Sequence, residues 1–132
     1  MAGERTPIDL PPELDLPGVL NAPVATAVRG NGFVFTMGYM AMDPTTGDIS
    51  PGPIEHETRL TMQGFERILD AAGSSLAKVV KVHVFLADID RDFDAMNRVY
   101  AEFFDPPYPA RRTVEAKLAR SLKVEIDVIA LE

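Results

Sequence analysis

The run from Val79 to Leu86 constrains the fold more than any other segment, because its side chains alternate with a period of two residues. Val80, Val82, Val84 and Leu86 share one face, as in a strand that packs against a hydrophobic layer. We expect this run to be the central strand of a sheet. One stretch of helical periodicity precedes it and another follows it, and helices packed on a sheet are one of the few stable layered arrangements.

The two helical stretches have clear boundaries. The first begins near Ile54, after a Pro-Gly-Pro triplet, and ends at Gly73, and the second runs from about Arg91 to Phe104 and is stopped by prolines. Gly64 lies inside the first helix, where it costs about 1 kcal/mol relative to alanine, so we expect close packing at that point. The apolar stripe of the first helix contains Leu60, Gly64, Ile68 and Ala72, and that of the second contains Phe93, Met96, Tyr100 and Phe103.

Two strands are predicted ahead of the first helix. Residues 25–28 and 32–39 favour strands, and Arg29-Gly30-Asn31-Gly32 between them has the signals of a tight hairpin turn. The segment from Asp43 to Asp48 predicts a second turn. It lacks the spaced acidic ligands and the closing glutamate of a calcium loop.

The C-terminal part predicts two more strands. Arg111 begins a short alternating run directly after a proline-rich turn, and a second run extends from Leu122 to Leu131. We interpret the two runs as a C-terminal β-hairpin. The predicted element order is therefore β-β-α-β-α-β-β.

One face of the last strand is mixed in character. A sheet with helices on one side must either expose its other side to water or bury it against another subunit. Because Phe85, Ile129 and Leu131 lie on that other side, we expect partial burial there and hence an oligomer. The residues expected to face the helices are Leu122, Val124, Ile126, Val128 and Ala130, and those expected to face away are Lys123, Glu125, Asp127, Ile129 and Leu131.

The length of 132 residues is that of one domain, so we treat residues 1–132 as a single unit. Five of the eleven prolines lie within residues 5–23, and we interpret residues 1–21 as an extended proline-rich arm. No apolar run approaches the roughly 20 residues that span a bilayer. We expect a soluble, cytoplasmic protein with no membrane partner.

Composition also narrows the chemistry. The net charge of −7 disfavours a nucleic-acid partner, and the absence of cysteine removes disulfides, thiolate catalysis and cysteine-ligated metals. His56 and His83 are far apart and lack metal-ligand spacing, so we interpret both as structural and expect no metal site. Arg111 remains the group best suited to hold an anion such as a carboxylate. An arginine at a strand start is, on its own, more often a surface or ion-paired residue.

Four stretches, taken in their order and spacing, resemble the RidA/YjgF family, also called the L-PSP endoribonuclease-like proteins, and together cover most of residues 22–132. The resemblance implies an α+β fold like that of the small chorismate mutases, with a mixed sheet and two helices on one face. It also implies a homotrimer with pockets between subunits. The stretches are Phe35–Gly38 with Met42–Gly47, Ile68–Leu76, Val79–Asp88 running into Phe93–Phe104, and Pro109–Glu115 with Val124–Ala130.

The activity implied by this resemblance is hydrolysis of reactive enamines and imines to 2-keto acids and ammonia. By similarity, Arg111 would grip the substrate carboxylate and Glu125 would orient or activate the attacking water. Backbone groups at Gly38 and Thr113 would contact the reacting atoms. No metal or organic cofactor is needed, because a polarised imine carbon requires only a fixed carboxylate, a placed water and a proton shuttle. For Glu125 a cross-strand salt bridge is an equally good interpretation.

Several pocket positions depart from the family pattern. Val24 replaces the usual tyrosine, the usual Ser-Gly-Gln reads Met37-Gly38-Tyr39, and Thr113 stands where cysteine is usual. The connection before the last strand is one residue shorter and lacks the usual Leu-Pro-Lys-Asp turn. We expect a more apolar pocket and a substrate with a larger or more hydrophobic side chain, and we count Val24, Met37 and Tyr39 among the substrate-contacting positions.

Two further residues near the predicted site, Asn97 and Arg112, have simpler interpretations. Asn97 interrupts an apolar helix stripe, where a local hydrogen bond is the simpler explanation, and we include it among the substrate-contacting positions. Arg112 points to the other side of its strand and has no implied role. The alternative to a deaminase is a trimeric binding protein for small carboxylates that has lost turnover. Ribonuclease activity ranks last, because the chain is acidic and has no histidine pair suited to phosphodiester cleavage.

Overall fold

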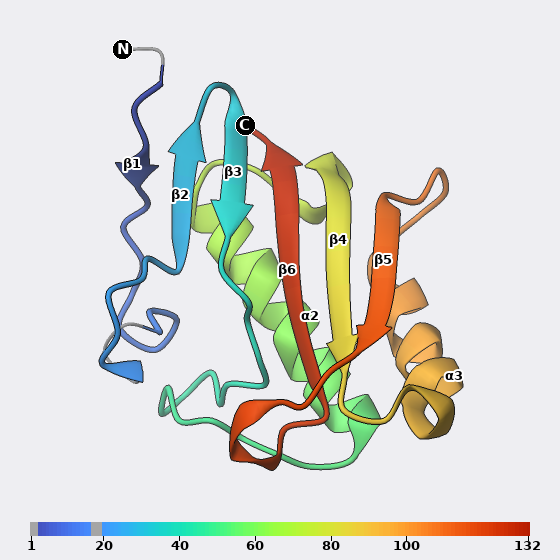
Figure 1. Ribbon diagram of the computed structural model, residues 1–132. Helices are drawn as coiled ribbons and strands as arrows, with labels where there is room; N and C mark the ends of the chain where they lie inside the picture. The colour runs from blue at the N-terminus through green and yellow to red at the C-terminus, as the bar shows by residue number, and fades with distance from the viewer. Residues whose placement is uncertain (1–2, 17–19) are drawn as a thin grey trace.

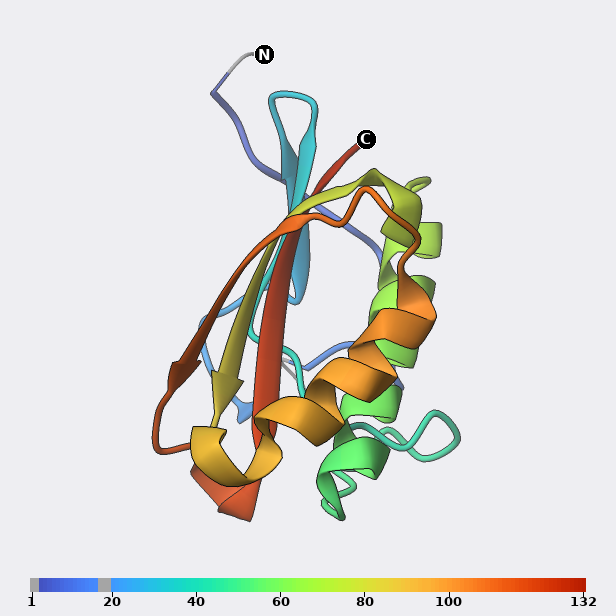
Figure 2. The same cartoon turned by 90° about the vertical axis from the view of Figure 1, so that its right-hand side faces the viewer.

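The computed structural model describes residues 3–16 and 20–132, and they form one mixed sheet with helices on a single face (Figures 1 and 2). The strand order is β1-β2-β3-β6-β4-β5, and among these strands β4 and β5 pair in parallel while the other neighbours pair antiparallel. Seen edge-on, the sheet has both long helices on one side, and no helix of the described residues covers the other (Figure 2). The strands are β1 Thr6–Pro7, β2 Ala27–Gly30, β3 Phe33–Thr36, β4 Val79–Leu86, β5 Ala110–Glu115 and β6 Val124–Leu131; the helices are α2 Ile54–Ala71 and α3 Ile89–Tyr100, with short 3₁₀ turns at Leu76–Lys78, Ala101–Phe103 and Ala119–Ser121.

The ends of the helices follow from local chemistry. Helix α2 begins after Pro53 and stops before Gly73, which has a φ of +76° that favours glycine. Helix α3 begins after Asp88, whose carboxylate accepts a hydrogen bond from the Arg91 backbone N–H at 3.0 Å. The predicted start at Ile54 and stop at Gly73 are confirmed.

Both predicted turns near the N-terminal strands are confirmed. Strands β2 and β3 pair antiparallel through Asn31 and Gly32, which have φ values of 51° and 85°. In the second turn the Asp43 carboxylate accepts hydrogen bonds from the backbone N–H groups of Thr45 and Thr46 at 2.8 and 3.1 Å. These bonds hold the pKa of Asp43 below its usual value.

The predicted C-terminal hairpin is wrong. Strand β4 lies between β5 and β6, pairing parallel with β5 and antiparallel with β6. The physical reason is that β4, α3 and β5 form a β-α-β unit, whose crossover helix brings the two parallel strands side by side. The chain after β5 then crosses the end of β4 to reach β6 (Figure 1). Alternation in the sequence identified the strands but carried no information on which strands pair.

The faces of β4 also differ from expectation at one end. A register irregularity between Val79 and Lys81 in the β4–β6 pair shifts the alternation, so Val79 enters the core and Val80 is 41% exposed. The rest of the strand keeps the predicted pattern. In β6 the predicted inward residues Val124, Ile126, Val128 and Ala130 are buried, as is Leu122 just before the strand. Lys123, expected to face away from the helices, instead reaches the start of α2, where its Nζ donates to the Gly52 carbonyl at 2.8 Å.

The expected N-terminal arm covers residues 1–21, of which 1–2 and 17–19 lie outside the described residues. Its described part is more than an extended segment. Strand β1 pairs with β2, and Leu14 and Leu16 are buried in the core. No helix among the described residues is long and apolar enough to cross a membrane.

One buried carboxylate, that of Glu57, links two segments that are distant in the sequence. The Glu57 side chain has no exposed surface, and its carboxylate accepts hydrogen bonds from the backbone N–H groups of Gly52 at 3.1 Å and of Lys123 at 2.8 Å. These bonds satisfy a carboxylate that would otherwise be costly to bury. Glu57 therefore connects the start of α2 to the segment that enters β6.

The expected close packing at Gly64 is confirmed. A Cβ atom at this position would overlap Cε2 of Tyr39, whose ring is buried between α2 and the sheet and tilted against Phe65 at 5.6 Å between centroids. The Tyr39 hydroxyl donates to the Leu14 carbonyl at 3.3 Å. Gly64 thus leaves room for the largest fully buried ring of the core.

We expect Gly64→Ala to lower the free energy of unfolding by about 1–3 kcal/mol, because overpacking a rigid core outweighs the better helix propensity of alanine. Thermal and urea unfolding measure the effect. The matched control is Gln63→Ala on the exposed side of the same helix. In a Tyr39→Leu background the cost of Gly64→Ala should largely vanish, and an equal cost in both backgrounds would contradict the overlap.

Candidate functional site

Arg111 lies on the edge strand β5 and faces the helix side of the sheet. It pairs in register with Val82, which is fully buried on that side. The centre of the Arg111 guanidinium lies 4.7 Å from the centroid of the Tyr100 ring and 5.8 Å from that of Phe93. Both rings come from α3, so the cation is held against aromatic faces at the end of the helical layer.

A cavity of about 320 Å³ opens beside this guanidinium. Within residues 3–16 and 20–132, the Arg111 guanidinium makes no ion pair with a carboxylate and no hydrogen bond of good geometry; only the Tyr100 hydroxyl among these residues is close enough for a weak hydrogen-bonding contact with it. A guanidinium carries five N–H donors in a planar fork and is suited to a bidentate carboxylate. The cavity can therefore receive a small anion. Its lining residues are Asn97, Tyr100, Ala101, Tyr108, Pro109 and Arg111.

The predicted residues Thr113 and Asn97 lie on the same side of the sheet as Arg111. Thr113 pairs in register with the buried Val84 and is itself half-buried. Asn97 lines the cavity, and its Oδ1 atom is buried without a hydrogen-bond partner among the described residues. The local hydrogen bond expected for Asn97 Oδ1 is therefore not formed.

Aromatic residues around Arg111 were missed by the sequence analysis, which placed Phe93 and Tyr100 in the apolar stripe of the helix. Tyr108, which also lines the cavity, is 57% exposed. The sequence did carry a signal for this grouping. Asn97 follows Phe93 by four residues and Tyr100 follows Asn97 by three, a spacing that puts all three on one side of α3. That side faces β5 and not the centre of the core.

Glu125 lies on the opposite face of the sheet, away from the helices. It pairs in register with Phe85 of β4 and is half-buried. Its carboxylate covers Gly38, where a Cβ atom would lie 2.6 Å from Glu125 Oε2. Burial raises the pKa of the Glu125 carboxyl, and the nearby Asp127 carboxylate raises it further. Gly38 and Glu125, each predicted as a site residue, thus lie next to one another.

A polar row lies next to Glu125 on the same face. His83 Nδ1 and Asp127 Oδ1 are 2.6 Å apart across the β4–β6 pair, and Arg112 stands beside His83 in the β4–β5 register. His83 therefore makes a structural contact, as expected. Arg112 faces away from Arg111, also as expected.

The three positions Val24, Met37 and Tyr39, which were expected to contact substrate, differ in how far their side chains are exposed. Val24 is 41% exposed, and Met37 is half-buried, its backbone N–H bonded to the Thr26 carbonyl at 2.9 Å. The expectation for Tyr39 is wrong. Its side chain is fully buried, and its backbone N–H and carbonyl both bond to Ile126 of β6. Strand alternation turns Tyr39 into the core and leaves Gly38 on the outer face.

One chain therefore divides the predicted site into two groups. The Arg111 group, consisting of Arg111, Thr113 and Asn97, lies on the helix side of the sheet's edge. The Glu125 group, consisting of Glu125 and Gly38, lies on the outer face two strands away, roughly 10 Å across the sheet. A small molecule held by Arg111 does not reach Glu125 of the same chain.

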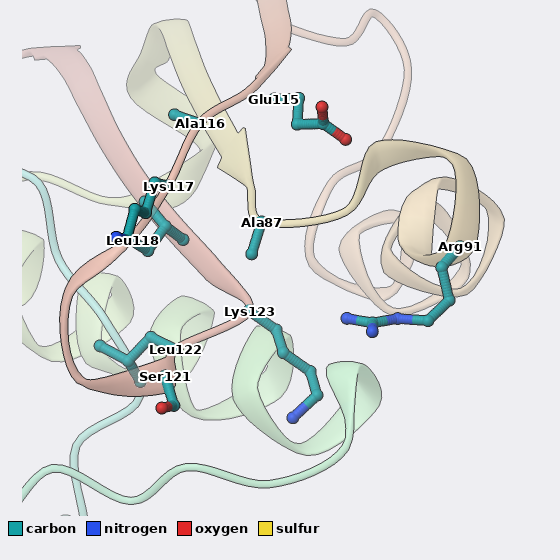
Figure 3. A pocket seen from close by; sticks show the side chains of 9 residues that line it. All are labelled: Ala87, Arg91, Glu115, Ala116, Lys117, Leu118, Ser121, Leu122 and Lys123. Carbon is teal, nitrogen blue, oxygen red and sulfur yellow. The ribbon is translucent and has the colours of Figure 1, made fainter.

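A larger cavity of about 680 Å³ lies at the end of the sheet where β4 leads into α3 (Figure 3). Arg91 and Lys123 extend toward it, but both are engaged, Arg91 with Asp92 at 2.8 Å and Lys123 with the Gly52 carbonyl at 2.8 Å. None of the predicted site residues lines this cavity. We therefore place the candidate site at the Arg111 and Glu125 groups.

The sequence matches a known protein family over most of its length. Residues 18–132 match the family model described as Endoribonuclease L-PSP. The mitochondrial protein mmf2 of Schizosaccharomyces pombe is 46% identical over 114 residues, covering 83% of this chain and 88% of its own. The 2-iminobutanoate/2-iminopropanoate deaminase of Capra hircus is 37% identical over 111 residues, covering 83% of this chain and 80% of its own.

Solved structures agree with these sequence relatives. The crystal structure of yeast Mmf1 superposes with a TM-score of 0.85 at 33% identity, covering 98% of this chain and 99% of that one. Escherichia coli TdcF with bound serine superposes with a TM-score of 0.76 at 31% identity, covering 96% and 93%. The matched family model spans most of the chain, and the relatives agree with it in sequence and fold. The chain therefore belongs to the Endoribonuclease L-PSP family, also known as the RidA/YjgF family.

Proposed function

We propose that this protein hydrolyses reactive 2-imino acids, and the enamines that form them, to 2-keto acids and ammonia. The observation that carries the proposal is the Arg111 guanidinium, which lies in a cavity against aromatic rings with no carboxylate partner among the described residues. Relatives named 2-iminobutanoate/2-iminopropanoate deaminase, and a relative crystallised with serine, support a small ligand with a carboxylate.

The proposed hydrolysis needs one group that binds the carboxylate and one group that transfers protons. Arg111 binds the carboxylate in a bidentate pair and fixes the C=N bond relative to the attacking water. As water adds to the imine carbon, Glu125 takes one of its protons and passes it to the nitrogen, which gives a carbinolamine. Glu125 then transfers the proton of the new hydroxyl group to the nitrogen, so that the C–N bond breaks, ammonia leaves and the carbonyl of the 2-keto acid forms. The raised pKa of Glu125 suits a carboxylate that accepts and returns a proton.

We further propose that each site combines the Arg111 group of one subunit with the Glu125 group of a neighbour, in a homotrimer. Two groups on opposite faces of one sheet meet only when a second copy supplies one of them. The uncovered outer face supports association, since Phe35, Val114 and Leu131 on it are 40%, 36% and 44% exposed. A ring of identical, head-to-tail contacts would place one site at each junction.

The apolar residues at Val24 and Met37 support a substrate with a larger or more hydrophobic side chain than the aminoacrylate-type imines. A hydrophobic pocket gains about 0.8 kcal/mol for each buried CH₂ group. The alternative remains a binding protein for small carboxylates without turnover, and the same experiment separates the two.

We expect the protein to accelerate imine decay in an assay in which an amino-acid oxidase generates 2-imino acids of several side-chain classes. Arg111→Ala should lower kcat/KM by roughly 100-fold or more, because each hydrogen bond to a charged group contributes about 1.5–3 kcal/mol. Arg98→Ala, an equal charge change on the exposed side of α3, is the matched control. Binding of 2-keto acids without any acceleration would favour the binding protein, and neither binding nor acceleration would contradict both functions.

The shared site predicts complementation between two inactive variants. When Arg111→Ala and Glu125→Gln chains are co-expressed with different tags and particles that carry both tags are isolated, about one third of the junctions in these mixed trimers should carry both intact residues. Activity should therefore reappear at about that fraction of the wild-type value. Light scattering should give three chains per particle. Mixed assemblies as inactive as their parents would contradict a site built from two subunits.

Asp127 sets a testable pH dependence. Its negative charge raises the pKa of Glu125, so Asp127→Asn should lower that pKa and move the acid limb of the kcat/KM profile to lower pH. The direction follows because Glu125 must be ionised to accept a proton. An acid limb that stays in place in Asp127→Asn would show that it belongs to another group.

A further inference from the structure

Two buried polar atoms near Arg111 are left without a hydrogen bond of good geometry among residues 3–16 and 20–132. They are the hydroxyl of Tyr100 and Oδ1 of Asn97. Both residues belong to α3, three positions apart, and both line the cavity that holds the Arg111 guanidinium. Buried polar groups are almost always hydrogen-bonded, so two orphaned acceptors in one cavity need an explanation.

The Arg111 guanidinium beside them has more N–H donors than a bound carboxylate would use. A carboxylate bound in a bidentate pair uses two of the five N–H groups of Arg111 and leaves the others unmatched. The ring of Tyr100 lies under the guanidinium at 4.7 Å, and the residue is only 6% exposed. Burial raises the pKa of the Tyr100 hydroxyl, and the positive charge of Arg111, together with a weak hydrogen-bonding contact between the two side chains, opposes that rise.

We infer that Tyr100 is the positioning residue of the anion clamp. Its ring supports the flat face of the Arg111 guanidinium. When a carboxylate binds, its hydroxyl accepts a hydrogen bond from one of the remaining N–H groups, and Asn97 Oδ1 accepts from another. The guanidinium is then fixed in plane and in rotation, as bidentate recognition requires.

This inference rests on the proposed carboxylate clamp at Arg111 and assigns a role that does not involve contact with the substrate. Tyr100 suits the role because of where it sits. Its neighbours Met96 and Val99 are buried in the core and fix the helix, while Tyr100 presents both a ring face and a hydroxyl toward β5. Phe93, the other ring beside Arg111, lies farther away at 5.8 Å and has no hydroxyl.

The test compares Tyr100→Phe and Tyr100→Leu with the wild-type protein, using 2-oxobutanoate as the probe in isothermal titration calorimetry. We expect Tyr100→Phe to weaken binding by about 3-fold and Tyr100→Leu by about 10-fold or more, since the first loses one acceptor and the second also loses the ring. Binding of the uncharged amide of 2-oxobutanoate, which the clamp grips poorly, should change by less than about 2-fold. In turnover, KM should rise while kcat stays within about 2-fold.

A double-mutant cycle with Arg111→Lys shows whether Tyr100 acts through the guanidinium. Lysine keeps the charge but has no planar fork to hold, so Tyr100→Leu should cost less than about 2-fold in that background. Equal losses in both backgrounds, or wild-type affinity in Tyr100→Phe, would overturn the inference. If Tyr100→Leu does not fold, the near-isosteric Tyr100→Phe decides alone. A wild-type protein that binds no 2-oxobutanoate would instead overturn the carboxylate clamp itself.

Discussion

The two hydrogen-bonded ladders on either side of β4 fix the position of both site groups. Its antiparallel pairing with β6 puts Glu125 beside Phe85 on the outer face, and its parallel pairing with β5 puts Arg111 beside Val82 on the helix side. A slip of one residue in either ladder would turn one of the two groups to the other face. The buried side chains of β4 hold the registers in place, because a slip would expose them to water.

The sequence alone predicted the local structure well. Alternation, helical periodicity and turn residues located the long elements, and Gly64 correctly marked a close contact with α2. Strand pairing was not accessible in the same way, because a period of two describes a strand and not its neighbour. The hairpin between β5 and β6 failed for this reason, and the irregularity beside Val79 displaced Val80 from the core for the same reason.

The candidate site shows a similar division. The resemblance to a known family located Arg111, Glu125 and Gly38, and the structure places the last two in contact. Tyr39 was misplaced because consecutive residues of an extended chain face opposite ways, so a motif of three adjacent residues cannot line one pocket with all its side chains. The aromatic support of Arg111 was missed because Tyr100 and Phe93 also satisfy an apolar helix stripe, and only tertiary structure shows that this side of α3 faces β5.

The contact between Gly38 and Glu125 has an evolutionary consequence. A Cβ atom at position 38 would lie 2.6 Å from Oε2 of Glu125, so a side chain there would displace the Glu125 carboxylate from its present position. Relatives that keep a glutamate at the second position should keep glycine at the first, and relatives that lose the acid are free to vary both. The two positions, distant in sequence, are therefore expected to change together across the family, and a larger residue at position 38 would mark a member that no longer uses this carboxylate.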